Sequence, residues 1–133
     1  MSTNAEQKDE PLLDIRGLKT HFHTARGTVQ AVDEVDLEIQ AGQRVALVGE
    51  SGSGKSVTAK SIMGLIDDPG EIVSGEINFR STDLTDLSEP ELADIRGNEI
   101  SMIFQSPMTA LNPTITVGRQ IARVLHLHRE EFE

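Results

Sequence analysis

The chain has 133 residues, enough for one domain, and carries 22 acidic against 12 basic residues, a formal net charge of −10. Because a nucleic-acid-binding surface needs a surplus of positive charge, this balance disfavours DNA or RNA as a partner. The lack of cysteine excludes disulfides and thiolate metal sites. No apolar run approaches the ~20 residues of a membrane-spanning helix.

The N-terminal segment is polar and lacks the apolar core of a signal peptide. We therefore expect a disordered tail over residues 1–10, followed by a domain over residues 11–133. The first strand is predicted at residues 11–18, where Leu13 and Ile15 would face inward. With only 3% aromatic residues, the core of this domain must be built from aliphatic side chains.

A turn at residues 24–27 leads to a second predicted strand at 28–39, because apolar residues alternate there with acidic ones. Residues 45–48 form a short apolar run of the type found in buried parallel strands. Apolar residues at helical spacing follow at 57–66. Strands of antiparallel type therefore precede a buried parallel strand and a helix, which indicates an α/β fold.

The segment between the third strand and this helix is the most informative part of the chain. It consists of Gly49, Glu50, Ser51, Gly52, Ser53, Gly54, Lys55 and Ser56, matching the phosphate-binding pattern G-x-x-x-x-G-K-[ST]. The glycines allow backbone N–H groups to converge on an anion, which the N-terminus of the next helix also favours. Lys55 would meet the β- and γ-phosphates, and Ser56 would offer its hydroxyl to Mg²⁺. We predict that this loop, with Val57, binds a nucleotide; an ordinary glycine turn is the alternative.

Three further elements are predicted after the first helix. Residues 67–70 are expected to form a loop, and residues 75–79 a strand with alternating apolar positions. Ser88 and Glu91 have the spacing of a capping box, which predicts a short helix that ends at Gly97.

The last third of the chain is expected to contain one more strand and one more helix. A second buried strand is predicted at 100–104 and a loop at 105–113, where two prolines occur. Thr116 can cap a last helix. Its apolar stripe would consist of Val117, Ile121, Val124, Leu125 and His128.

The second motif lies in this loop. It consists of Phe104, Gln105, Ser106, Pro107, Met108, Thr109, Ala110, Leu111, Asn112 and Pro113. Together with residues 49–56 and 27–33, it resembles the ATP-binding subunit of ABC transporters, and most closely the dipeptide and oligopeptide importer branch, which nickel importers share. The resemblance runs from about Leu12 to the C-terminus. It implies an α/β P-loop fold of ABC type, with an antiparallel layer and an incomplete parallel-sheet core.

The resemblance implies further site residues. Gln105 would be the Q-loop glutamine, whose amide can reach Mg²⁺ or the attacking water, so Ser56 and Gln105 are the candidate metal ligands. Arg26 stands where the family has an aromatic residue that stacks on adenine, and its guanidinium could stack there instead. Phe22 is the alternative. The implied cofactors are ATP and Mg²⁺.

In the family, the segment after this glutamine lies against a cytoplasmic helix of the permease. The candidate docking residues are Pro107, Met108, Leu111, Asn112 and Pro113. Core packing is the alternative for Met108, Leu111 and the apolar stripe. The resemblance implies transmembrane permease subunits, a second ATP-binding subunit and, indirectly, an extracytoplasmic solute-binding protein as partners. It places the chain in the cytoplasm, peripheral on the inner face of the cell membrane.

An ABC ATPase also needs an apolar strand ending in Asp-Glu, a Ser-Gly-Gly-Gln signature and a switch histidine. Nothing after Gln105 matches these, so no catalytic residue is assigned, and the chain is expected to be a truncated subunit that binds ATP without turning it over. A nucleotide-binding or permease-docking module without catalysis is the alternative. A small GTPase is a remote one, because residues 94–97 have the form D-x-x-G but no guanine-reading motif exists.

Overall fold

The computed structural model describes residues 10–106 and 110–128, so the predicted N-terminal tail falls almost wholly outside the described residues. The chain divides into two units, the first ending at Leu87 and the second beginning at Ser88. Each unit has its own secondary structure, and each is described by itself.

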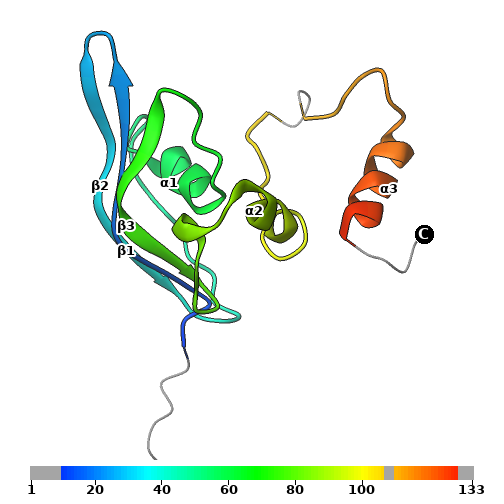
Figure 1. The fold of residues 1–133 in the computed structure, drawn as a ribbon, viewed down its shortest axis with the longest axis horizontal. Helices are drawn as coiled ribbons and strands as arrows, with labels where there is room; N and C mark the ends of the chain where they lie inside the picture. The colour runs from blue at the N-terminus through cyan, green and yellow to red at the C-terminus, as the bar shows by residue number, and fades with distance from the viewer. Residues whose placement is uncertain (1–9, 107–109, 129–133) are drawn as a thin grey trace, which may run out of the picture. The chain divides into compact units, whose positions relative to one another are not determined.

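The first unit is an antiparallel sheet with a helix against one face (Figure 1). Its strands are β1 (Leu13–Thr24), β2 (Gly27–Ile39), β3 (Gly70–Phe79) and the two-residue β4 (Thr82–Asp83), in the spatial order β2-β1-β3-β4. Helix α1 (Lys55–Ile62) contacts β1 and β2, and a 3-10 turn, η1 (Leu84–Asp86), follows β4. The antiparallel layer and the hairpin turn after Thr24 are as predicted from the sequence.

The core of this unit lies between the sheet and α1. Its apolar members are Leu13, Ile15, Leu18, Val32, Met63, Ile77, Phe79 and Leu84. Two buried hydroxyls join the helix to β1, because Ser61 Oγ donates to Val57 O at 2.8 Å and lies 2.8 Å from Thr20 Oγ1. A hydroxyl has one hydrogen to donate, so Thr20 is the donor to Ser61. The pair fixes the helix on the sheet without leaving a buried polar group unsatisfied.

A bulge interrupts the middle of the sheet where β1 passes β3. The register with β3 shifts after Arg16 and that with β2 after Ile15, and Gly17 and Gly75 adopt φ values of 56° and 101°. A Cβ on Gly75 would lie 2.6 Å from Gly17 O, closer than real side-chain atoms approach. The Gly17 N–H leaves the strand ladder and donates to Asp36 Oδ1 at 2.6 Å. Glycine at position 75 is therefore required both by its φ and by the close approach of β1.

Strands β1 and β3 are longer than predicted. The sequence placed them at 11–18 and 75–79 and assigned a loop to 67–70. In the structure the two strands continue to pair beyond the bulge, with His21 opposite Glu71, and β3 begins inside the predicted loop. The length of these strands depends on how far they pair with each other, and the local alternation of apolar residues does not predict that pairing.

Helix α1 is shorter at its C-terminus than the predicted helix at 57–66. It begins at Lys55 and ends at Ile62. Gly64, at φ 60°, donates its N–H to Ser61 O at 3.0 Å, so the glycine turns the chain out of the helix. The apolar spacing continues past the point at which the backbone leaves the helix.

The predicted buried strand at 45–48 is wrong for the described structure. Residues 45–48 are outside any strand, and Val45, Leu47 and Val48 are 42%, 47% and 91% exposed. A parallel strand needs hydrogen-bonded neighbours, and none of the described segments pairs with this one. The apolar run indicates that residues 45–48 favour burial. Burial as a strand also requires neighbouring strands, which these four residues do not contain.

The second buried strand, predicted at 100–104, does not form either. The only pairing that involves it within residues 10–106 and 110–128 is a single parallel bridge between Ile100 and Arg96. Ile103 is 95% exposed and Phe104 is 46% exposed. The physical reason is the same as for 45–48: the described chain offers no neighbouring strand.

The second unit contains two helices, α2 (Glu89–Ile95) and α3 (Val117–His128). The predicted capping box is confirmed: the Glu91 carboxylate accepts from the Ser88 N–H at 2.8 Å. Gly97, at φ 80°, follows the end of α2 as predicted, and α3 begins directly after Thr116. Neither helix buries a side chain, so the apolar stripe of α3 is not a core.

None of the helices in the part of the chain that the structure describes is both long and apolar enough to cross a membrane.

Candidate nucleotide-phosphate site

The loop of residues 49–54 leads directly into α1. Gly52 and Gly54 have φ values of 80° and 89°, in the left-handed region that favours glycine. Gly54 is also the N-cap of α1. A Cβ on Gly54 would lie 2.4 Å from Ala31 O of β2, so only glycine lets the loop approach the sheet this closely.

The first turn of α1 is anchored to the same glycine. Thr58 donates both its N–H, at 2.8 Å, and its hydroxyl, at 3.0 Å, to Gly54 O. Thr58 is buried, at 4% exposure. The N–H groups of the preceding helical residues have no intrahelical acceptor, so they are available to an anion at this helix end.

The side chain of Lys55 folds back into the loop. Its ammonium group donates to Gly49 O and Glu50 O, each at 2.7 Å, and to Ser53 Oγ at 3.1 Å. A lysine ammonium has three hydrogens, and all three are used here. The positive charge is therefore held at the loop by the loop's own acceptors.

These residues surround a small cavity of about 140 Å³. Its lining consists of Ala31, Gly52, Ser53, Gly54, Lys55, Ser56 and Val57. Lys55 carries the only formal charge among these lining residues, and no carboxylate lines the cavity within the described structure. A hollow at a helix N-terminus with backbone amides and one ammonium group fits a phosphate chain.

Most of the predicted phosphate-site residues are thus brought together. Gly49 and Glu50 take part through their carbonyls, which hold Lys55, although they do not line the cavity. A Cβ on Gly49 would lie 2.4 Å from Ser53 Oγ, so a side chain there would disturb the loop. Ala31 was missed from the sequence, because its carbonyl reaches the loop only through the fold of β2.

The two candidates for adenine stacking are placed differently. Arg26 lies in the hairpin turn between β1 and β2, where its N–H donates to Thr24 Oγ1 at 3.3 Å, and it does not line the cavity. Phe22 packs its ring over Gly70 on β3, where an added Cβ would lie 2.6 Å from the ring. The ring of Phe22 is therefore engaged inside the sheet, and Arg26 remains a predicted stacking residue.

Gln105 and the candidate docking residues belong to the second unit. Gln105 is exposed, and its cooperation with Ser56 at a metal ion remains a prediction. Pro107 and Met108 lie outside the described residues. Leu111, Asn112 and Pro113 are exposed. Asn112 Oδ1 accepts from Thr114 N–H at 2.9 Å, which holds the turn before α3.

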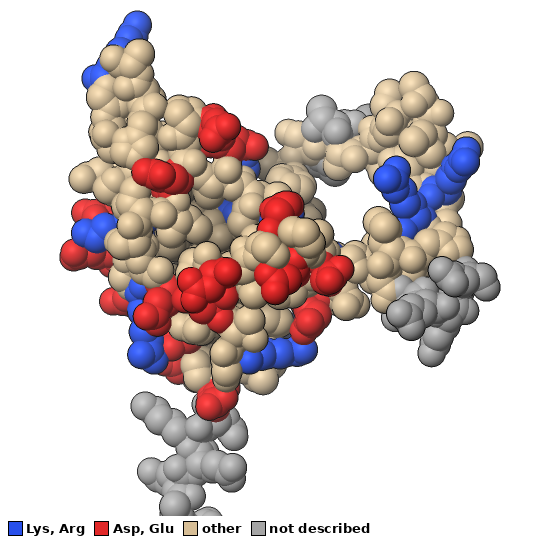
Figure 2. Space-filling model, viewed as in Figure 1, with Lys and Arg blue, Asp and Glu red and all other residues tan. Residues whose placement is uncertain are grey.

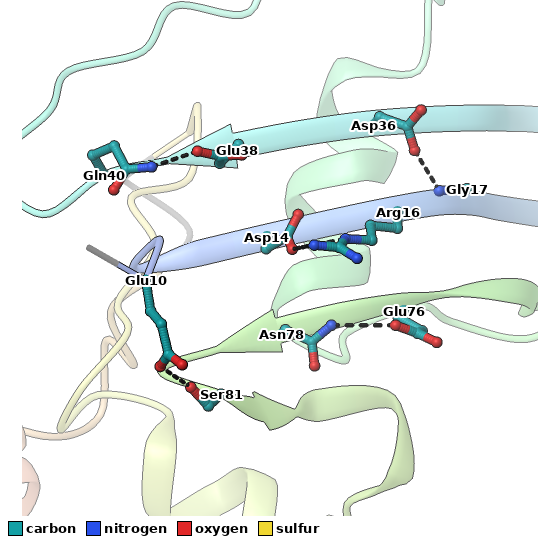
Figure 3. A network of polar contacts seen from close by, with 10 residues as sticks. All are labelled: Glu10, Asp14, Arg16, Gly17, Asp36, Glu38, Gln40, Glu76, Asn78 and Ser81. Atoms are coloured by element: carbon teal, nitrogen blue, oxygen red, sulfur yellow. Dashed lines mark hydrogen bonds and ion pairs between the residues drawn. The ribbon is translucent and has the colours of Figure 1, made fainter. Parts of the chain in front are cut away.

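A second polar cluster lies on the outer face of the sheet and differs in charge from the loop (Figure 3). It consists of Glu10, Asp14, Arg16, Gly17, Asp36, Glu38, Gln40, Glu76, Asn78 and Ser81. Arg16 is 2.7 Å from Asp14, and the hydrogen bond to this carboxylate, followed by its charge, raises the pKa of the guanidinium. Carboxylates outnumber cations here, so this face repels phosphate.

Neither the histidines of β1 nor the D-x-x-G segment forms a site among the described residues. His23 contacts Thr28 Oγ1 at 3.1 Å and Glu71 Oε1 at 2.8 Å, and no group of three or more potential ligands suited to a metal ion occurs among the described residues. Residues 94–97 span the end of α2 and the glycine after it, where no strand precedes them as a GTPase would require.

Known proteins similar to this chain show the family to which it belongs. The model of the ABC transporter family matches residues 32–132, which is most of the chain. The chain belongs to the ABC transporter family. A dimeric bacterial ABC transporter cassette, MJ0796, has a similar fold, with a TM-score of 0.75 and 26% identity over 86% of this chain and 47% of that one.

Curated relatives in this family are named as ATP-binding proteins of peptide transport. The dipeptide transport ATP-binding protein DppD of Lactococcus lactis subsp. cremoris is 50% identical over 92% of this chain and 35% of its own length. The oligopeptide transport ATP-binding protein AppD of Bacillus subtilis is 52% identical over 89% of this chain and 36% of its own length. The chain thus spans about a third of the length of these ABC transporter relatives.

Proposed function

We propose that residues 49–56 bind the phosphates of ATP. The observation that carries this proposal is the cavity at the N-terminus of α1, lined by Gly52, Gly54 and Lys55 and free of carboxylates among the described residues. The backbone amides would meet the phosphate oxygens, and the ammonium group would neutralise part of their charge. Arg26 is the proposed contact for the adenine ring.

Lys55 must change partners when a triphosphate enters. Its three hydrogens are taken by Gly49 O, Glu50 O and Ser53 Oγ, and the last of these contacts is the longest, at 3.1 Å. We expect the phosphate to replace Ser53 Oγ, because an ionised acceptor binds an ammonium group more strongly than a hydroxyl does. The two carbonyls would continue to aim the side chain.

The residues proposed to hold Mg²⁺ are Ser56 and Gln105. A hydroxyl and an amide carbonyl are oxygen ligands of the kind that this ion prefers. When bound, Mg²⁺ would neutralise phosphate charge. No carboxylate lines the cavity within residues 10–106 and 110–128, so the described chain offers no general base next to it. We therefore propose binding of ATP without turnover by this chain.

For the larger protein, we propose an ATP-binding subunit of an importer for peptides or a related solute. The support is the printed names of relatives such as DppD and AppD, at 50% and 52% identity. The proposed partners are transmembrane permease subunits, docked through the segment around residues 111–113, and a second ATP-binding subunit. A solute-binding protein would take part indirectly. The proposed location is the cytoplasmic face of the cell membrane.

Isothermal titration calorimetry with Mg-ATP tests the binding proposal. We expect saturable heat from the wild-type chain and a loss of at least about tenfold in affinity, about 1.4 kcal/mol, for Lys55→Ala. Lys60→Ala is the matched control, because Lys60 lies on the same helix, pairs with Asp67 at 3.0 Å and does not line the cavity.

Two results would contradict this proposal. Equal loss of affinity in the Lys55 and Lys60 variants would mean that net charge, and not the loop, attracts the nucleotide. Mg-dependent ATP hydrolysis by the wild-type chain that Lys55→Ala abolishes would contradict binding without turnover. Stronger binding of GTP than of ATP would instead favour a GTPase.

A further inference from the structure

The end of the β1–β2 hairpin projects beyond the rest of its sheet. The pairing of β1 with β3 reaches Phe22, whereas the pairing of β1 with β2 continues to Thr24, opposite Gly27. Figure 1 shows the two strands continuing past the end of β3. A ribbon of two strands is only marginally stable by itself. The turn at this end carries Arg26, so the contacts that order the ribbon also decide where this guanidinium lies.

The projecting end differs in charge from the surface behind it. Arg26 is the only Lys, Arg, Asp or Glu residue between Lys19 and Asp33. In Figure 2 this end of the hairpin shows basic groups and no acidic ones, whereas acidic groups predominate over the rest of the first unit. The end of the hairpin therefore suits an anionic ligand better than the remainder of this surface does.

Thr24 fixes the shape of the turn. Its Oγ1 donates to Gly27 O at 2.7 Å and accepts from the Arg26 N–H at 3.3 Å. Both bonds join residues of the turn to each other. They leave the direction of the turn relative to the sheet to other contacts.

His23 bonds to both strands that neighbour β1. Its backbone N–H donates to Pro69 O, directly before β3, at 3.0 Å. Its ring Nε2 lies 2.8 Å from Glu71 Oε1 on β3, and its Nδ1 lies 3.1 Å from Thr28 Oγ1 on β2. An ionised carboxylate can only accept, so Nε2 carries the hydrogen of this contact, and Nδ1 can accept from the threonine hydroxyl. One ring thus joins three strands at the point where the ribbon leaves the sheet.

The preceding residue holds the same segment from the opposite face of the sheet. Successive side chains of a strand point to opposite faces, so Phe22 and His23 lie on its two sides. The Phe22 ring packs over Gly70, where an added Cβ would lie 2.6 Å from the ring. His23 bonds to the residues on either side of Gly70. Residues 69–71 therefore hold two consecutive residues of β1.

A bulge gives the ribbon a place to bend where it is not held. The register of β1 with β2 shifts between Thr20 and His21, which makes Ala31 an extra residue in β2. Ala31 also lines the phosphate cavity. Arg26 is five residues away, about 16 Å along an extended strand. A bend of about 10° at the bulge would move the turn by about 3 Å relative to the cavity, which is enough to break a stacking contact.

We propose that His23 is a positioning residue of the nucleotide site. By tying the ribbon to Pro69 and Glu71, it holds the turn in the direction in which the Arg26 guanidinium stacks on the adenine ring. This order exists before the nucleotide arrives, so binding does not have to supply it. His23 itself does not line the cavity. The inference rests on the proposed function, because it concerns the base contact of the same site.

Isothermal titration calorimetry of the full chain with Mg-ATP and with magnesium tripolyphosphate tests the inference. Tripolyphosphate has the phosphate chain without the base, so it reports on the loop alone. We expect His23→Ala to raise the Kd of Mg-ATP about threefold to fivefold, the range in which single exposed pairs contribute, and to leave the Kd of tripolyphosphate unchanged. Arg26→Ala should do the same. The double variant should lose little more than either single variant, because both changes act on one contact.

Glu71 provides a test that net charge cannot mimic. Glu71→Ala removes a negative charge, which by itself would strengthen the binding of an anion. We expect Mg-ATP binding to weaken instead, by about threefold, because the ribbon loses its tie to β3. Glu71→Gln keeps an acceptor oxygen for His23 Nε2 and should restore most of the affinity. The matched control is Glu76→Ala, which removes the same charge from the same strand on the other side of the bulge at Gly75.

Circular dichroism of each variant checks that it is folded. Equal weakening of both ligands by His23→Ala, or an unchanged Kd of Mg-ATP in His23→Ala or in Arg26→Ala, would overturn the inference and leave the phosphate site intact. A loss of Mg-ATP affinity in Glu76→Ala as large as that in Glu71→Ala would also overturn it. If the wild-type chain binds neither ligand, the proposed phosphate site itself is wrong, and the inference is overturned with it.

Discussion

The two units of this chain achieve order by different means. In the first unit, Ile15, Leu18 and Ile77 are at most 1% exposed between the sheet and α1. In the second unit, α2 and α3 bury no side chain and are held by caps and local hydrogen bonds. The loop of residues 49–54 is therefore built on a packed scaffold, whereas the helices of the second unit present their side chains to solvent.

Truncating one isoleucine in each unit should give the largest contrast. Ile77→Ala deletes buried methylene groups and leaves a cavity, so we expect a loss of about 3–4 kcal/mol in the free energy of unfolding of the first unit. Ile121→Ala on α3 makes the same change at a side chain that is 59% exposed. It should alter the free energy of unfolding by less than about 0.5 kcal/mol. Urea unfolding followed by circular dichroism measures both.

Similar losses in the two variants would break the comparison. They would mean that Ile121 is packed in solution, and that the second unit shares a core that the structure does not show.

Two glycine substitutions should have opposite signs. Gly75→Ala places a Cβ 2.6 Å from Gly17 O at φ 101°, so we expect a loss of about 2–3 kcal/mol from the first unit. Gly118→Ala on α3 meets nothing within 4 Å, and alanine should increase the stability of this helix by up to about 1 kcal/mol. Thermal unfolding and far-UV circular dichroism separate the two effects. If Gly75→Ala left the stability of the first unit unchanged, the bulge between β1 and β3 would accommodate a Cβ at little energetic cost, which contradicts this prediction.

The buried hydroxyl pair should contribute less than the apolar core. Ser61→Ala leaves the Thr20 hydroxyl, which is fully buried, without its acceptor, so we expect a loss of about 1–2 kcal/mol. Adding Thr20→Val removes the unsatisfied hydroxyl and should recover part of the loss. A double-mutant cycle in urea measures the coupling. Strict additivity of the two changes would contradict the hydrogen bond.

The smallest effect concerns Asp83 and pH. Burial raises the pKa of its carboxyl, but hydrogen bonds from the Thr85 N–H and hydroxyl and from the Ile77 N–H outweigh it and leave the pKa lowered. A lowered pKa in the folded state adds stability above the unfolded value, about 4, and this stability is lost as the pH falls through the folded value.

Asp83→Asn should therefore destabilise the first unit at pH 6, and the difference from wild type should shrink as the pH falls below about 4. Urea midpoints measured from pH 2.5 to pH 7, in steps of about 0.5, check this. A pH-independent effect of Asp83→Asn would contradict the lowered pKa of Asp83.

The pKa of Glu91 is also lowered, by hydrogen bonds from the Ser88 hydroxyl and N–H. Glu91→Gln should change the helicity of α2 and leave the unfolding midpoint of the first unit unaltered.

Local features were predictable from the sequence, and distant ones were not. The capping box at Ser88 and the glycine-rich loop depend on residues a few positions apart, and the sequence displays both directly. The approach of Ala31 to Gly54 and the bulge at Gly75 depend on segments about twenty to sixty residues apart, for which no local pattern exists. The apolar run at 45–48 has the composition of a strand, but its state depends on neighbours that composition does not contain.

The central claim, that residues 49–56 bind a nucleotide's phosphates, can be tested residue by residue. Two-dimensional ¹H–¹⁵N NMR spectra of the full chain, recorded during titration with Mg-ATP, report each backbone amide. We predict saturable shifts of the amides of Gly52, Gly54, Lys55 and Ser56, with the amides of α3 unchanged. Shifts confined to residues outside 49–57, or no saturable shift in the loop at millimolar nucleotide, would contradict the claim.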